Sequence, residues 1–335
     1  MPTAKTIRSR KHIRLSYANF YVGFTPNDLF RFVLPDLVHL YDFEITNRPG
    51  YLIYGPYGGK LPTGSYVKIF YGCENVVPNM AECDWAFGVE HEDLVHHPRY
   101  MRLLWGAPLP LTKTSFDASD VLDGKRCFCN FVYSHRVPFR EEFYKALSRY
   151  KRVDAPGISL NNMAAIDSGP PADWQKTKQA FLSCYKFTIA FENSSRPGYN
   201  TEKLTDPMLA GSLPIYWGDP LIEREFDARS FIHAQTYLRG WNLRMPRLPV
   251  RYEPYAPLFP RRTFRDRAFA RLNRAVNNYE MKIAAFRAFD QLVEAVIAAD
   301  TDDELYRSYF TVPYYRNNRA PDRSSYIARW QQIFG

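Results

Sequence analysis

One stretch of the sequence, from Tyr185 to Pro220 (YKFTIAFENSSRPGYNTEKLTDPMLAGSLPIYWGDP), places the strongest constraint on the fold. An apolar run is followed by a polar loop, an acidic–basic pair and a second apolar run. The two runs have the length of buried strands and the segment between them suits a helix, so the stretch predicts a βαβ unit. Ligand-binding groups of such a unit gather beyond the carboxyl end of its first strand. We therefore expect a binding site in the polar loop.

The residues around this loop are suited to binding an anion. Thr201 is a good N-cap, which would put Glu202 and Lys203 in the first turn of a helix. The free backbone N–H groups at that helix end favour a phosphate, and Lys203 adds a positive charge. Arg140, at a second strand-to-helix turn, would add a fork for bidentate contact. On these residues alone, an ordinary surface ion pair remains the alternative.

The length of 335 residues predicts two domains, because a single hydrophobic core rarely grows so large. The Pro- and Gly-rich segment from Gly106 to Gly124 is typical of a linker. We expect a first domain over residues 1–118, a second over residues 119–310 and a tail over residues 311–335. Further expected elements are the strands 13–20, 51–54, 67–71 and 84–89. A helix is expected over 29–38, capped by Asp28 and kinked or ended by Pro35, with a further helix over 174–183 and a long helix over 272–299.

The formal net charge of +9 favours anionic partners. Because the basic residues are scattered and no nucleic-acid-binding motif is present, a nucleotide-sized anion is favoured and nucleic acid is not expected. The five cysteines are sparse and odd in number, which favours a reducing compartment. No apolar run of about 18 residues and no signal-peptide core is found. These features favour a cytoplasmic protein. The basic, aromatic tail is expected to form a docked helix, with a peripheral contact to the inner membrane surface as the alternative.

Two other motifs do not support a site. The segment GPYGGK, residues 55–60, has three residues where a P-loop needs four, so it predicts a tight glycine turn. Six acidic and His side chains crowd residues 90–97, but without the spacing of a known metal motif. No metal site is expected there.

Three segments together resemble the α-1,3/4-fucosyltransferases, glycosyltransferase family ten, in its bacterial type. FENSSRPGYNTEK followed by LAGSLPIYWGDP is similar to the family signature. IFYGCEN (residues 69–75) and VYSHRVPFREEFYKAL (residues 132–147) resemble two further family segments. The likeness covers most of residues 65–235. His135 and Val76–Pro78 depart from the family pattern.

This resemblance implies an α/β GT-B architecture of two Rossmann-like domains that face each other across a cleft. The first domain would hold the acceptor and the second GDP-fucose, with inversion at the fucose carbon. Glu74 would be the general base, with Tyr71 beside it as a contact to the donor, and Arg140 and Lys203 would hold the diphosphate. The residues that would contact nucleotide or fucose are Asn193, Tyr199 and Glu202, and Glu202 would also stabilise an oxocarbenium-like state.

The resemblance also implies a donor and an acceptor but no required cofactor. The donor would be GDP-fucose, and the acceptor a GlcNAc-containing glycan such as N-acetyllactosamine, fucosylated at O3. No DxD pair follows a strand, so no metal is required, although stimulation by a divalent cation is left open. The alternatives are a GDP-sugar transferase with another glycan or lipopolysaccharide acceptor, and a non-enzymatic protein that binds polyanions or membranes. The linkage position and the oligomeric state are left open.

Overall fold

The computed structural model describes residues 10–166, 174–238 and 264–335. These residues form two compact units. The first unit contains residues 10–108, 264–266 and 321–335, and the second contains residues 109–166, 174–238 and 267–320. Residues 109–118 thus belong with the second unit, and the end of the tail belongs with the first.

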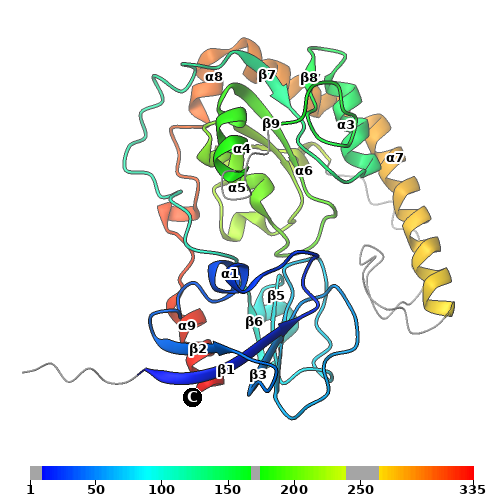
Figure 1. Cartoon of the computed structure of the whole chain (residues 1–335). Coiled ribbons are helices and arrows are strands. Elements are labelled where there is room, and N and C mark those ends of the chain that lie inside the picture. Colours follow the sequence, from blue (N-terminus) through cyan, green and yellow to red (C-terminus); the bar gives the residue numbers. More distant parts are fainter. Residues whose placement is uncertain (1–9, 167–173, 239–263) are drawn as a thin grey trace, which may run out of the picture. The chain divides into compact units, whose positions relative to one another are not determined.

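The first unit is built on a six-stranded parallel sheet with the order β2-β1-β3-β4-β5-β6 (Figure 1). In chain order its strands are β1 (Lys11–Ala18), β2 (Tyr41–Ile45), β3 (Tyr51–Tyr54), β4 (Val67–Tyr71), β5 (Trp85–Gly88) and β6 (Tyr100–Arg102). Because all six strands run in the same direction, their carboxyl ends share one edge of the sheet.

The helix expected over residues 29–38 begins and ends elsewhere. Helix α1 (Pro26–Asp28) is capped by Thr25, and it continues as a π-helical turn, η1 (Leu29–Val33). Asp28 lies at the third helical position, where its carboxylate accepts from the backbone N–H of Thr25 at 2.8 Å. The two residues therefore form a capping box, in which Thr25 rather than Asp28 is the cap. The first unit also contains a short helix, α2 (Glu92–Val95).

The chain ends in helix α9 (Ser324–Phe334), which packs on the first sheet beside β1 and β2 (Figure 1). Its buried residues are Tyr326, Trp330, Ile333 and Phe334, which recur at helical spacing. Trp330 stacks on Phe87 of β5 with ring centroids 4.5 Å apart. Phe334 contacts the ring of Tyr51 in β3 at 4.9 Å. Helix α9 is thus part of the core of the first unit.

The second unit has a five-stranded parallel sheet with the order β11-β10-β9-β7-β8. Its strands are β7 (Cys127–Asn130), β8 (Val153–Asp154), β9 (Tyr185–Phe191), β10 (Leu213–Trp217) and β11 (Ile232–His233). Its helices are α3 (Pro138–Leu147), α4 (Trp174–Ser183), α5 (Glu202–Leu209), α6 (Ala234–Tyr237), α7 (Phe264–Thr301) and α8 (Asp303–Ser308), with short 3₁₀ turns η2 (Ile222–Arg224), η3 (Ala228–Ser230) and η4 (Arg316–Asn318). The order β9-α5-β10 confirms the predicted βαβ unit.

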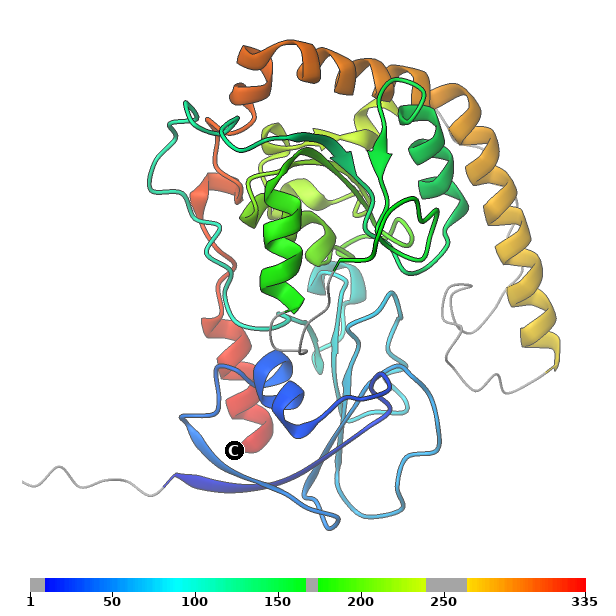
Figure 2. The ribbon, with the colours of Figure 1, turned by 45° about the horizontal axis from the view of Figure 1, so that its top comes forward.

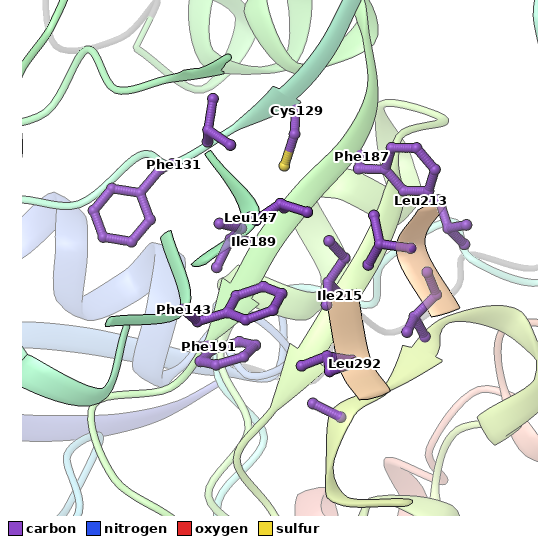
Figure 3. Packing of buried hydrophobic residues seen from close by; sticks show 14 of the residues in the cluster. Cys129, Phe131, Phe143, Leu147, Phe187, Ile189, Phe191, Leu213, Ile215 and Leu292 are labelled. Atoms are coloured by element: carbon purple, nitrogen blue, oxygen red, sulfur yellow. The ribbon is translucent and has the colours of Figure 1, made fainter. Parts of the chain in front are cut away.

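The core of the second unit lies on the face of β9 that α3 and α7 cover (Figures 2 and 3). Phe187, Ile189 and Phe191 alternate along β9 and are fully buried, as a period of two on one strand face requires. Phe143 of α3 stacks on Phe191 with centroids 4.9 Å apart. Leu292 of α7 fills the same cluster. This packing holds the carboxyl end of β9 in place.

The two parallel sheets confirm the predicted α/β class. No helix of the described residues is long and apolar enough to cross a membrane. All five cysteines are free thiols.

Trp330→Ala should lower the free energy of unfolding by about 3–5 kcal/mol, because it removes a fully buried indole that stacks on Phe87. A denaturant titration measures the change. Gln332→Ala, at an exposed position of the same helix, is the matched control and should change stability little. Equal stability of the two variants would contradict the docking of α9.

Candidate active site

Polar groups of the second unit meet where β9 and β10 end. Glu192 follows β9 directly, and its side chain has no exposed surface. Its backbone N–H donates to the carbonyl of Trp217, the last residue of β10, at 2.8 Å. Glu192 is therefore an acidic residue in the protein interior whose position is set by the pairing of two strands.

The buried Glu192 carboxylate is compensated by the start of helix α5. Its Oε1 accepts from the backbone N–H of Thr201 at 2.8 Å, and the Thr201 hydroxyl lies 2.9 Å from both carboxylate oxygens. Thr201 also accepts from the backbone N–H of Lys203 at 3.3 Å, which confirms it as the N-cap. Burial raises the pKa of Glu192, although the Lys203 charge and the Thr201 hydrogen bonds oppose this effect.

The ammonium group of Lys203 lies among three oxygen atoms. Its Nζ is 3.0 Å from Thr201 Oγ1, 3.3 Å from Glu192 Oε2 and 3.6 Å from Glu202 Oε1. Desolvation lowers the pKa of Lys203, but Glu192 and Glu202 raise it by more, so the net shift is upward. Lys203 thus remains a cation at neutral pH.

Glu202 differs from Glu192 in its exposure, since 59% of its side chain is accessible. Desolvation raises the pKa of Glu202, but Lys203 and Lys178 outweigh it and the net shift is downward. The structure therefore brings together one buried carboxylate, one accessible carboxylate and one cation within a single turn of α5 and the end of β9.

Arg140 forms a second cationic group in the same unit. It lies in the first turn of α3 and is 1% exposed. Its guanidinium donates to Asn193 Oδ1 at 2.8 Å and to the carbonyl of His135 at 2.8 Å, and it lies 3.9 Å above the ring of Tyr133. In the described part of the chain, the buried Nε of Arg140 has no hydrogen-bond partner. Desolvation accordingly lowers the pKa of Arg140.

Arg140 and Lys203 belong to one electrostatic site. The Arg140 charge is among the groups that act on the titration of Lys203, where it opposes the two carboxylates. The Tyr133 hydroxyl, close to both cations, donates to the carbonyl of Ile189 and accepts from the backbone N–H of Phe191, each at 2.7 Å. Two cations in partly desolvated positions are an arrangement suited to an anion with more than one charge.

The loop between β9 and α5 is held by a buried aspartate. Asp219 accepts from the backbone N–H groups of Gly198 and Leu221, each at 2.8 Å. Gly198 has a φ of +79°, which favours glycine at this turn. Tyr199, next in the chain, is only 2% exposed. Tyr199, which was predicted to contact the ligand, thus has its side chain packed within the loop.

The Gly of the PIYWG segment fits against Glu192. A Cβ at Gly218 would lie 2.4 Å from Cγ of Glu192 and 2.7 Å from the hydroxyl oxygen of Tyr216. No larger residue can occupy this position unless the buried carboxylate moves. The FEN, TEK and PIYWG segments are therefore three parts of one packed arrangement.

The first unit contains the predicted base, Glu74, just beyond the end of β4. Its Oε1 accepts a hydrogen bond from the Tyr57 hydroxyl at 2.6 Å. Tyr71, expected beside it as a ligand contact, is fully buried instead, and its hydroxyl lies 2.9 Å from that of Tyr326 in α9. Tyr71 points to the same sheet face as Ile69, which α9 covers, and this alternation explains its place in the core.

Two functional candidates are absent from the residues expected above: Glu192 and Tyr57. The position of Glu192, an acidic residue directly after a buried strand, was a usable signal in the sequence. Tyr57 had none, because its contact with Glu74 depends on the pairing of β3 with β4. In the described ranges, no group of three or more His, Cys, Asp or Glu side chains is arranged to hold a metal ion.

Comparison with known proteins gives matches to two domain models of one family. Residues 123–245 match the C-terminal domain of glycosyltransferase family 10 (fucosyltransferase). Residues 15–106 match the N-terminal domain of the alpha-(1,3)-fucosyltransferase FucT. The two matches cover the strand-end residues of both units.

Two individual relatives share about three tenths of their aligned residues with this chain. A putative fucosyltransferase, R654, of Acanthamoeba polyphaga mimivirus is 30% identical over 209 residues, which are 61% of this chain and 27% of that protein. An alpha-(1,3)-fucosyltransferase, FucT, of Helicobacter pylori is 29% identical over 253 residues, 63% of this chain and 50% of that protein. The chain thus spans half or less of the length of these relatives.

A solved structure of an alpha1,3-fucosyltransferase with GDP-fucose has a similar fold. It aligns with a TM-score of 0.63 at 19% identity, covering 100% of this chain and 94% of that one. The likeness confirms the predicted GT-B fold class.

Gly218→Ala should lower the free energy of unfolding by about 1–3 kcal/mol, because the added methyl group overlaps the Glu192 side chain. Gly50→Ala is the control, since its nearest new neighbour would be the carbonyl oxygen of Arg14 at 3.7 Å. Denaturant titrations of both variants measure the difference. A Gly218→Ala protein as stable as the control would contradict the close packing of Glu192.

Proposed function

The chain belongs to glycosyltransferase family 10, and we propose that it transfers L-fucose from GDP-fucose to a hydroxyl group of a glycan. One observation carries this proposal: Glu192, Thr201, Lys203 and Gly218, which belong to three separate signature segments, form a single packed site. The relatives described as fucosyltransferases and the solved structure with GDP-fucose support the choice of donor.

The donor diphosphate would be held by Lys203 and Arg140. A diphosphate gains negative charge as the bond to fucose breaks, so fixed positive groups stabilise the transition state more than the ground state. Glu192 would hold Lys203 in place through its 3.3 Å ion pair. Asn193 accepts a hydrogen bond from Arg140 and would thereby orient the guanidinium within the GDP-fucose site.

In the proposed reaction the acceptor oxygen attacks the anomeric carbon of fucose, while the bond from this carbon to the diphosphate oxygen breaks. The acceptor proton passes to the carboxylate of Glu74, and the configuration at the carbon is inverted. A positioned base contributes about 10²–10⁴ to the rate of such a step. The accessible carboxylate of Glu202 would stabilise the positive charge that develops on the sugar ring.

The acceptor that we propose is O3 of GlcNAc in an N-acetyllactosamine-type glycan. Transfer assays with GDP-fucose, GDP-mannose and UDP-sugars, each against a panel of glycans and lipopolysaccharides, test donor and acceptor together. We expect a fucosylated product only with GDP-fucose and a GlcNAc-containing glycan. Absence of fucose transfer to every acceptor would refute the proposed activity, and transfer only to other glycans would refute the proposed acceptor.

Lys203→Gln should weaken GDP-fucose binding by about 10- to 100-fold, because a hydrogen bond to a charged group contributes about 1.5–3 kcal/mol. The amide retains N–H donors for the buried Glu192 carboxylate. Calorimetric titration with GDP-fucose measures the change. Lys145→Gln, which removes an exposed lysine paired with Glu142 on α3, is the control and should bind as the unmodified protein does. Equal affinity of the two variants would exclude Lys203 from donor binding.

Glu74→Gln should reduce turnover by about 10²–10⁴ and leave GDP-fucose affinity unchanged, because the amide cannot accept the acceptor proton. Glu44→Gln, at an exposed position of β2 in the same unit, should retain full turnover. Initial rates and donor affinities of both variants make the comparison. Wild-type turnover of Glu74→Gln would show that another group is the base.

A further inference from the structure

The glycine turn that follows β3 is fastened to the end of β1. The backbone N–H of Gly55 donates to the carbonyl of Ala18 at 3.0 Å, and that of Tyr57 donates to the carbonyl of Asn19 at 2.9 Å. A Cβ at Gly55 would lie 2.6 Å from the Asn19 oxygen, so only glycine permits this close approach. Gly58 then turns the chain with a φ of +58°. Tyr57 is therefore held on both sides by backbone constraints.

The side chain of Tyr57 reaches the strand end that carries Glu74. Its hydroxyl donates to Glu74 Oε1 at 2.6 Å, a short hydrogen bond typical of an ionised acceptor. Its ring meets the edge of Tyr21 with centroids 6.4 Å apart. Strands β3 and β4 are parallel neighbours, and their shared carboxyl edge explains why residues 17 positions apart meet.

We propose that Tyr57 positions the Glu74 carboxylate as a base, an inference that rests on the proposed function. The hydrogen bond engages Oε1 and fixes the rotation of the carboxylate, which leaves Oε2 to take the acceptor proton. The glycine turn at residues 55–59 is then the device that presents Tyr57.

The proton balance requires that Tyr57 keep its own hydrogen. When the acceptor O–H bond breaks, its proton goes to Glu74, while the new oxygen–carbon bond forms and the diphosphate leaves. Burial, together with the Glu74 charge and hydrogen bond, raises the pKa of the Tyr57 phenol well above its usual value. Tyr57 therefore remains a neutral donor at neutral pH.

Other titratable groups face the Tyr57–Glu74 pair. Cys73, adjacent in the chain, has its pKa raised to about 12 by burial and by Glu74, so it is uncharged at neutral pH. Tyr21 follows β1, and its own neighbours Asp28 and Arg31 carry opposite charges. Tyr21, whose pKa is raised by burial, and Cys73 are thus both uncharged at neutral pH and add no charge beside the Tyr57–Glu74 pair.

The test is Tyr57→Phe in the full chain, which keeps the ring and removes only the hydroxyl. Turnover should fall about 10- to 100-fold with GDP-fucose affinity unchanged. In the Glu74→Gln background the same substitution should change turnover little, because Tyr57 acts through the Glu74 carboxylate. Melting temperatures verify that the variant is folded.

Tyr66→Phe is the matched control, since the Tyr66 hydroxyl donates to the carbonyl of Pro62 within the following loop. It should keep the wild-type rate. If Glu74→Gln is inactive but Tyr57→Phe has the wild-type rate, the inference fails while the proposed function stands. A further fall in turnover when Tyr57→Phe is added to Glu74→Gln would also overturn it, because a packing defect alone has that effect. If Glu74→Gln keeps wild-type turnover, the proposed base fails, and the inference fails with it.

Discussion

The second unit depends on the burial of one charged group, the carboxylate of Glu192. A buried carboxylate costs several kcal/mol unless hydrogen bonds and an opposite charge compensate it. Thr201 and Lys203 supply that compensation, and both belong to the first residues of α5 or its cap. The absence of a Cβ at Gly218 provides the space. One electrostatic requirement thus ties β9, β10 and α5 together and places Lys203 at the strand ends.

Parallel strand pairing creates the equivalent arrangement in the first unit. The carboxyl ends of neighbouring parallel strands share an edge. The segments that follow β3 and β4 therefore meet, although a loop and β4 itself lie between them in the chain. Tyr57 and Glu74 are brought within 2.6 Å in this way. In both units, the chemistry-bearing side chains lie at strand ends, while the strand interiors supply the rigid apolar support.

The tyrosines illustrate how packing assigns different roles to one residue type. Tyr71 lies on the face of β4 that α9 covers, so its hydroxyl finds Tyr326 inside the core. Tyr57 lies beyond a strand end, where its hydroxyl finds a carboxylate instead. The family resemblance implied Tyr71 beside Glu74, whereas in the structure the hydroxyl bonded to Glu74 is that of Tyr57. The C-terminal helix therefore affects which tyrosine is available to the base.

Local patterns in the sequence determined the elements and several of the site residues. The strands at 51–54 and 67–71, the helix at 174–183 and the cap at Thr201 follow from short-range rules of alternation and capping, and the structure has them. Only the tertiary structure decided that Glu192 is buried against Lys203 and that Tyr57 bonds to Glu74. These contacts depend on which strands are neighbours and which face is covered, and both are set by residues far apart in the chain.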